Sequence, residues 1–553
     1  MTAVDKIARM IRPAQLRENS PLVWSPGTGI DVWAMFCACI EGNVTTLRQL
    51  VNKDPSLARS QYGYRTPIYF AVRENQLEAV KFLFDHGADP FGGFGNDLLE
   101  IARDRGYAEM EKLLDGKLAA IHGASSRGEA VAGAIREHDL PKVRALLDAV
   151  RDLLHTGDAR GNQPIHWAVM TRQPGVIDEL LARGADIHAR RPDGARPIQL
   201  TNGDYHYRGW RDVPKEWPVT PAQVLAHLRA HGANVDIGTA CYLGELELVR
   251  KLLDEEPTLA NRVADYVTYY AGSGSPLKNA AAAGHLEIVQ LLLERGADPN
   301  LPEEGIAPRG HALYSAAANG HHEIARLLLE HGADPNSAVE SSGDALSRAI
   351  SNSDQRMIDL LCSYGAAQEL HILAYYGDVR TAAAMFAVNS ALADDPEALM
   401  NAAGEGQEPF VRLLLRYQPD LPKRLTFPAW SVGAKSRELN ILLFQHGMNP
   451  SQPDWLRIAP LHHFARTGDT EKAALFIEHD ADLHARDEDI CSTPLGWAAK
   501  FGKIEMVALL LKSGAKPNLT DDSPDLRWAT PLAWATRRGH SEIVKLLKQH
   551  GAT

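Results

Sequence analysis

The sequence predicts an all-α fold: an elongated solenoid of helix–turn–helix units joined by loops or hairpins. Three observations support this prediction. A phrase of about 26 residues recurs, its glycines return at intervals near 33 residues, and each copy pairs a short helix rich in small residues with a second helix that carries an apolar stripe. A unit with one apolar face buries that face by stacking on its neighbours. The 553 residues therefore predict one long curved array rather than several globular domains.

The recurring phrase is clearest in the middle of the chain. One copy, SPLKNAAAAGHLEIVQLLLERGADPN, begins at Ser275, and the next, HALYSAAANGHHEIARLLLEHGADPN, begins at His311. Gly296, Gly332 and Gly365 mark the same place in successive copies, 36 and 33 residues apart. A period near 33 residues with a T-P-L-x-x-A start is typical of ankyrin repeats. The sequence resembles the ankyrin-repeat family from about residue 33 to residue 553.

Each unit can be explained residue by residue. Ser275 is placed to cap the first helix, and Pro276 suits the first helical position because no N–H is needed there. Gly284 ends that helix by accepting a left-handed conformation. Ile288 and Leu291 belong to the apolar stripe of the second helix.

The array is expected to occupy residues 31–553, after an N-terminal tail or cap at residues 1–30. About sixteen units are expected, some of them degenerate. Their first helices are predicted to begin near Trp33, Thr66, Asp97, Glu129, Gln163, Arg196, Gly238, Ser275, His311, Ala345, Glu369, Ala398, Phe427, Ala459, Ser492 and Ala529. Inserted loops are predicted at about 201–222, 261–275, 301–310 and 337–344, and equivalent loops of a stacked array project on one side.

Composition and motifs narrow the function. The net charge of −12 weighs against general nucleic-acid binding, which needs clustered Lys and Arg. The N-terminus does not resemble a signal peptide, and no apolar stretch is long enough for a membrane helix, so a cytoplasmic protein with no membrane partner is expected. HExxH, paired CxxC and Walker-type motifs are absent from the sequence, so neither a metal site nor a cofactor is expected.

The first two insertions carry the candidate site residues. Asp204, His206, Asp212 and Asp265 are the candidate catalytic groups, because carboxylates and histidine can transfer protons. Aromatic side chains stack on flat ligands and Arg pairs with anions. The candidate ligand-binding residues are Tyr205, Tyr207, Arg208, Trp210, Tyr266, Tyr269, Tyr270, Tyr375 and Tyr376. The alternative is that these residues only fix the long loops to the solenoid.

The end of each first helix is expected to face the concave groove. There the early units carry charged pairs such as Arg73-Glu74 and Asp104-Arg105, the central units carry small residues, and the last units are basic, with Lys500 among them. The basic end could hold an acidic partner or could be a solvated face. Small groove residues beside the insertions predict a pocket near the sixth to ninth units.

Two functions follow from these observations. The resemblance to ankyrin proteins implies a scaffold that binds a protein partner through its concave groove and loop tips. The alternative is an enzyme, a hydrolase or lyase, or a binder of a small polar or carbohydrate-like ligand, with its site in the inserted loops of the central repeats. The sequence favours the scaffold and leaves catalysis undecided.

Overall fold

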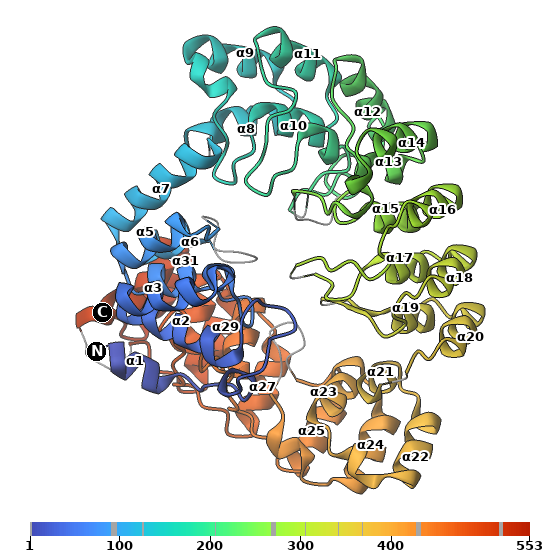
Figure 1. Ribbon diagram of the computed structural model, residues 1–553. Coiled ribbons are helices and arrows are strands. Elements are labelled where there is room, and N and C mark those ends of the chain that lie inside the picture. The colour runs from blue at the N-terminus through green and yellow to red at the C-terminus, as the bar shows by residue number, and fades with distance from the viewer. Residues whose placement is uncertain are drawn as a thin grey trace.

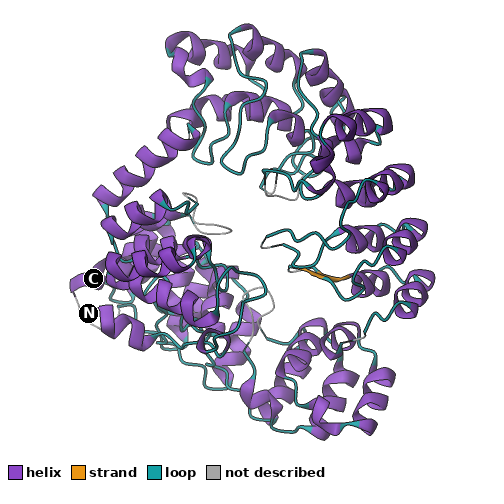
Figure 2. Cartoon of the chain, viewed as in Figure 1, coloured by secondary structure: helices purple, strands orange, loops and turns teal. Residues whose placement is uncertain are grey.

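The solenoid bends until its two ends meet, so that the helices form a ring (Figure 1). The computed structural model describes residues 3–89, 97–123, 126–204, 206–266, 272–304, 306–340, 342–367, 369–426, 433–518 and 524–553. Helices dominate, and the loops of the central units project toward the middle of the ring (Figure 2). Within these residues, no helix is long and apolar enough to cross a membrane.

Helices alternate between the inner and outer layers along the whole chain. The N-terminal part contains α1 (Ala3–Arg9), η1 (Gln15–Arg17), α2 (Gly29–Glu41), α3 (Val44–Lys53), η2 (Pro55–Arg59), α4 (Pro67–Arg73), α5 (Leu77–Asp85), α6 (Leu98–Arg105) and α7 (Ala108–His122), where η denotes a 3-10 turn. The next part contains η3 (Ser126–Gly128), α8 (Glu129–Arg136), α9 (Leu140–Ala149), η4 (Arg151–Leu154), α10 (Pro164–Met170), α11 (Pro174–Ala182), η5 (Pro197–Leu200), α12 (Pro221–Ala230), α13 (Ile237–Leu243), α14 (Leu246–Glu255) and η6 (Pro257–Asn261).

The second half of the chain continues this alternation. Its central part contains α15 (Pro276–Ala283), α16 (Leu286–Glu294), α17 (Ala312–Ala318), α18 (His322–Glu330), β1 (Ala338–Val339), β2 (Gly343–Asp344), α19 (Ala345–Ser351), α20 (Gln355–Ser363), α21 (Leu370–Tyr376), α22 (Val379–Val388) and η7 (Ser390–Ala393). The C-terminal part contains α23 (Pro396–Glu405), α24 (Glu408–Tyr417), η8 (Leu421–Arg424), α25 (Arg437–Gln445), α26 (Pro460–Thr467), α27 (Thr470–Glu478), α28 (Pro494–Lys500), α29 (Ile504–Lys512), η9 (Pro524–Ala529), α30 (Pro531–Arg537) and α31 (Ser541–Gln549).

The predicted all-α solenoid is confirmed, and so is the local logic of the unit. Ser275 caps α15 by accepting a hydrogen bond from Lys278 N, Pro276 is its first residue, and Gly284 ends it with a φ of +82°. The two strands form a short antiparallel hairpin that pairs Ala338 with Asp344, within the insertion at 337–344.

Two units differ from the common pattern. The unit near Arg196 has only the 3-10 turn η5 where most other described units have a first helix. The first helix predicted near Phe427 falls at residues 427–432, which lie outside the described residues. The described chain resumes there before α25, the second helix of that unit.

Several first helices share a buried tryptophan that fixes the preceding loop. Trp167, Trp497 and Trp534 are buried. The indole N–H of Trp167 donates to Asp158, and that of Trp497 donates to Asp487, at 2.8 and 2.9 Å. The repeated Trp–Asp bond positions the loop that contains Asp487, which becomes important where the ring closes.

The ring closes through a shared apolar core. Residues of the first three units and of the C-terminal units belong to one cluster of buried side chains. Trp455, in the loop before α26, packs against Phe36, Phe70 and Tyr62, with ring centroids 6.1, 5.9 and 5.5 Å away. The backbone N–H of Ile11 also donates to the Trp455 carbonyl at 3.0 Å. Contacts of this kind bury apolar surface between segments far apart in sequence.

Candidate functional site: the concave face

One position in each unit defines the concave face. It lies two residues before the left-handed residue that ends the first helix, and we call it the groove position. In three of the terminal units its occupant is charged and lies at the ring closure: Arg73, Asp104 and Lys500. These three side chains are mostly buried, because the concave faces of the N-terminal and C-terminal units lie against each other.

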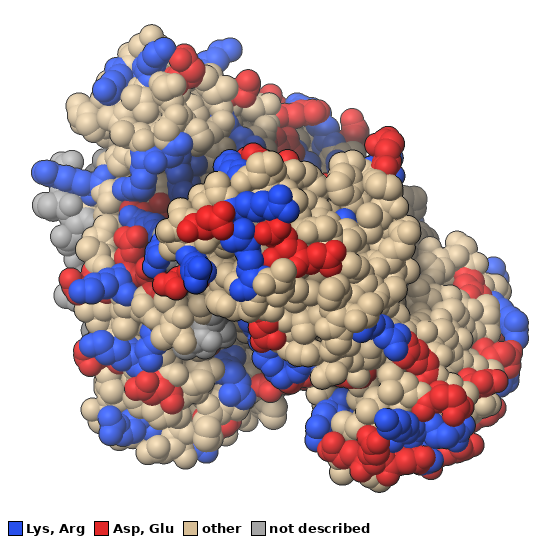
Figure 3. Space-filling view, turned by 90° about the horizontal axis from the view of Figure 1, so that it is seen from above, with Lys and Arg blue, Asp and Glu red and all other residues tan. Residues whose placement is uncertain are grey.

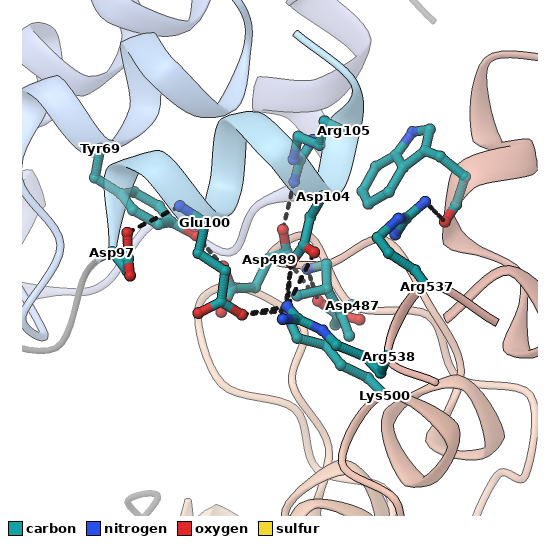
Figure 4. A network of polar contacts seen from close by, with 12 residues as sticks. Tyr69, Asp97, Glu100, Asp104, Arg105, Asp487, Asp489, Lys500, Arg537 and Arg538 are labelled. Carbon is teal, nitrogen blue, oxygen red and sulfur yellow. Dashed lines mark hydrogen bonds and ion pairs between the residues drawn. The ribbon is translucent and has the colours of Figure 1, made fainter. Parts of the chain in front are cut away.

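Asp104 is at the centre of one charged cluster (Figure 4). The Lys500 ammonium donates to Asp104 Oδ2 at 2.9 Å, and the Arg538 guanidinium donates to both oxygens of Asp104 at 2.8 and 2.9 Å. Arg538 also bonds to Glu100, one turn earlier on α6. The basic groove at the C-terminal end therefore does hold acidic groups, and they belong to the same chain.

A second cluster surrounds the acidic loop, residues 487–489. Arg65 pairs with the Asp489 carboxylate at 2.7 Å, and the Tyr69 hydroxyl also donates to it. Arg73 donates to the Glu488 carbonyl at 2.7 Å, and Arg105 donates to the Asp489 carbonyl at 2.6 Å. Every N-terminal donor in this set comes from the loop before α4, from α4 itself or from α6, so two neighbouring units together hold one loop.

The electrostatics of this closure favour ionised pairs. Burial alone would raise the pKa of Glu74, but Arg73, Arg105 and Lys6 outweigh it and lower that pKa to about 2. Burial would likewise raise the pKa of Asp489, and Arg65 and the Tyr69 hydrogen bond lower it instead. Such charge-assisted hydrogen bonds are stronger than neutral ones and fix geometry as well as affinity.

Asp454 differs from Asp489 and Glu74 in the direction of its pKa shift. Burial raises the pKa of its carboxyl to about 6, although the backbone N–H groups of Leu456 and Ile458 donate to it. Asp489 and Asp487 add to the upward shift because they are negative as well. Asp454 is thus a buried acid at the edge of the closure that lacks full charge compensation.

The central units keep their groove position open. Tyr242 and Tyr375 occupy it on α13 and α21 and expose 36% and 45% of their surface. Between them the position carries small residues such as Ala282 and Ala318. Tyr376 turns away from the groove position and donates its hydroxyl hydrogen to the Ser347 carbonyl at 2.7 Å.

Asp204 fixes the insertion at 201–222 to the solenoid. It is buried, pairs with Arg191 at 2.8 Å, and accepts from the backbone N–H groups of His206 and Tyr207. Burial would raise its pKa, but Arg191 and these hydrogen bonds lower it. Tyr207 packs edge-on against Trp167, with centroids 5.2 Å apart.

Other predicted residues of this insertion lie nearer its surface. Asp212 accepts from the backbone N–H of Arg208 at 2.7 Å and pairs with Arg211. His206 is exposed, and burial of part of its ring lowers its pKa. Trp210 is 70% exposed, more than any other described aromatic side chain of the insertion.

The insertion at 261–275 has two described candidate residues, one of which is buried and the other exposed. Tyr266 is buried, and its hydroxyl donates to the Gly272 carbonyl at 2.9 Å. Asp265 is exposed and pairs with Arg190 at 2.7 Å. Tyr205, Tyr269 and Tyr270 lie outside the described residues. Whether these residues and those of the first insertion bind a ligand stays a prediction.

The two later insertions reach across the ring. Glu340 accepts from the Tyr64 hydroxyl at 3.0 Å, and Glu304 lies 3.7 Å from Arg59. A cavity of about 380 Å³ lies between residues 302–304 and 306–308 on one side and the N-terminal segment 23–26 on the other. Its opposite wall comes from residues 23–26 and from Ser56 and Arg59, not from other central units, so the pocket predicted near the sixth to ninth units stays a prediction.

Comparison with known sequences decides the family. Profiles described as ankyrin repeats in three copies match residues 23–91, 304–369 and 430–521. A profile of many ankyrin copies matches 277–329, and a single-repeat profile matches 160–192 and 528–553. The chain belongs to the ankyrin-repeat family. Its helix pairs and its left-handed glycines are those of stacked ankyrin units.

Curated relatives share only part of this ankyrin array. A palmitoyltransferase AKR1 of Lachancea kluyveri is 27% identical over 172 residues, which are 30% of this chain and 23% of the relative. A probable E3 ubiquitin-protein ligase XBOS32 of Oryza sativa is 38% identical over 200 residues, 32% of this chain and 39% of the ligase. Palmitoyltransferase ZDHHC13 of Mus musculus is 37% identical over 79 residues, 14% of this chain and 13% of the relative. The matches thus span well under half the length of these relatives.

The ankyrin surface seen from above carries charges of both signs. Lys and Arg are interspersed with Asp and Glu across that face (Figure 3). A partner that needs a broad field of one sign would not find it there. The exposed groove tyrosines are therefore the more specific feature. Tyr242 was missed in the sequence, although it occupies the same position as Tyr375, two residues before the helix-ending glycine.

Proposed function

We propose that this ankyrin protein is an interaction scaffold whose protein partner binds the concave face of the central repeats, from α13 to α21. The observation that carries the proposal is the contrast at the groove position. In three of the terminal units the chain itself buries this position, at Arg73, Asp104 and Lys500, whereas Tyr242 and Tyr375 remain exposed in the central units.

The side chains on this surface are of the kinds that bind other proteins. Tyrosine and tryptophan are enriched among interface residues that dominate binding energy, because they bury a large area with little loss of conformational freedom. Ala282 and Ala318 between the two tyrosines leave room for a partner's side chains. Trp210 offers a third aromatic anchor from the neighbouring insertion. A partner with apolar side chains at matching intervals would fit.

Site-specific photo-crosslinking tests the proposal. A photoreactive phenylalanine derivative replaces Tyr242, Tyr375 or, as the control, the exposed Val388 at the end of an outer helix. The protein is irradiated in the cells that make it. We expect positions 242 and 375 to give an adduct of the same mass and position 388 to give none. Equal labelling at 388, or no adduct at 242 and 375, would contradict the proposal.

A further inference from the structure

Two neighbouring outer helices direct three metal-binding side chains to one point. Asp178 lies on α11, His227 lies on α12, and His231 is the residue that caps the end of α12. These helices flank the longest insertion and lie side by side at the outer edge of the ring (Figure 1). His227 and His231 are four residues apart, so their side chains share one face of the helix.

The geometry of the three side chains is convergent. His227 Nε2 lies 2.7 Å from Asp178 Oδ1, and His231 Nε2 lies 3.0 Å from the same oxygen. The ligand atoms of the group all lie within 4.8 Å of one another. In a tetrahedral zinc site with bonds near 2.0 Å, ligand atoms are about 3.3 Å apart. Small side-chain rotations would therefore admit an ion.

The sequence of the other units makes His227 conspicuous. It lies five residues before the glycine that follows the second helix, where most units carry Leu, as at Leu327, and the two exceptions besides His227 are Phe82 and Glu179. His231 occupies a position where histidine is common here, but the others differ in what they contact. His331, for example, directs Nδ1 to the Leu327 carbonyl at 2.8 Å. In the α12 unit, His227 thus stands where most units have an apolar residue. His231 contacts a carboxylate, whereas the corresponding His331 contacts backbone.

We propose that Asp178, His227 and His231 bind a divalent transition-metal ion, with Zn²⁺ as the best fit. Two neutral imidazoles and one carboxylate form a donor set suited to zinc, and a partly exposed site leaves a fourth position for water. On binding, the ion would displace the protons through which the two imidazole Nε2 atoms contact the Asp178 carboxylate. It would connect α11 to α12 and so stabilise the two units that flank the insertion at 201–222.

Cobalt substitution tests this site on the full-length protein. Co²⁺ alone is titrated into metal-free protein, and visible absorption reports its coordination by imidazole and carboxylate. The variant His227→Leu carries the residue that sibling units have, so it should fold normally. The control is His331→Leu, which removes the histidine that corresponds to His231 in another unit, where it contacts backbone instead of a carboxylate.

The outcomes are distinct. We expect one equivalent of Co²⁺ to produce absorption bands of low-coordinate cobalt in the native protein and in His331→Leu. His227→Leu and Asp178→Asn should each raise the dissociation constant by at least about 10–100-fold, since even indirect contacts to a metal are worth that much. Unchanged bands in His227→Leu, or no bands in the native protein, would overturn the proposal. Asp178→Asn serves as the test if His227→Leu does not fold.

Discussion

Lys500 and Asp104 are 396 residues apart in the chain, yet the Lys500 ammonium donates to the Asp104 carboxylate at 2.9 Å. Each is a groove position of its own unit, on α28 and α6. An ankyrin groove usually faces solvent or a partner. Here two grooves of one chain face each other, so the terminal units act as each other's ligand and the array becomes a ring.

Removing Asp104 should weaken the closure strongly. Asp104→Ala leaves Lys500 and Arg538 close together without the carboxylate that both contact. Breaking a buried ion pair from one side costs about 3–5 kcal/mol. We expect a drop of this order in the free energy of unfolding, measured in urea. Glu78→Ala, which breaks the exposed pair with Lys81, is the control and should change stability by less than about 1 kcal/mol.

The apolar part of the closure has its own test. Trp455→Ala removes the ring that packs on Phe36, Phe70 and Tyr62. Large aromatic deletions in cores cost about 3–5 kcal/mol, and the partial exposure of Trp455 sets the lower end of that range as the expectation. Trp210→Ala removes a tryptophan that is 70% exposed and should leave the melting temperature unchanged. Equal losses in both variants would argue against the closure.

Asp454 predicts an unusual dependence of stability on pH. Its pKa is about 6 in the folded protein and 3.8 when unperturbed, so the folded state binds more protons between these values. Its contribution is therefore fully favourable below about pH 4 and is lost as the pH rises through 6. Asp454→Asn keeps an acceptor for the two backbone N–H groups without the charge. We expect it to raise the free energy of unfolding at pH 8 by at most about 3 kcal/mol, and hardly at pH 4. A gain of equal size at both pH values would contradict this account.

Glu74 predicts the opposite dependence. Its pKa is lowered to about 2, so its stabilising contribution is present above its ordinary value of 4.5 and is lost as the pH falls toward 2. Glu74→Gln should therefore lower stability at pH 7 and have little effect at pH 2. Urea denaturation of this variant and of Asp454→Asn at matched pH values would show effects of opposite sign.

The sequence was sufficient for everything that depends on neighbours along the chain. Ser275, Pro276 and Gly284 predict their helix because caps and left-handed glycines act within one turn. The His166 ring nitrogen accepts a hydrogen bond from the backbone N–H of Gln163, three residues earlier.

The closure could not be predicted in this way. Lys500 and Asp104 were both recognised as groove residues, but nothing in either segment indicates the other, because the curvature of the array accumulates over many small rotations between units. The one sequence feature that could have indicated the closure is the opposite charge of groove residues at the two ends of the chain, such as Asp104 and Lys500. The contact between Asp178 and His227 could not be predicted either, because an insertion of irregular length separates their helices.

Small-angle X-ray scattering of the native protein in solution tests the closed ring most directly. The account predicts a scattering curve that fits the closed ring of Figure 1, and a larger radius of gyration for a variant that combines Asp104→Ala with Trp455→Ala. A native curve that instead requires an open arc, and that the two substitutions leave unchanged, would contradict the claim that the terminal repeats bind each other.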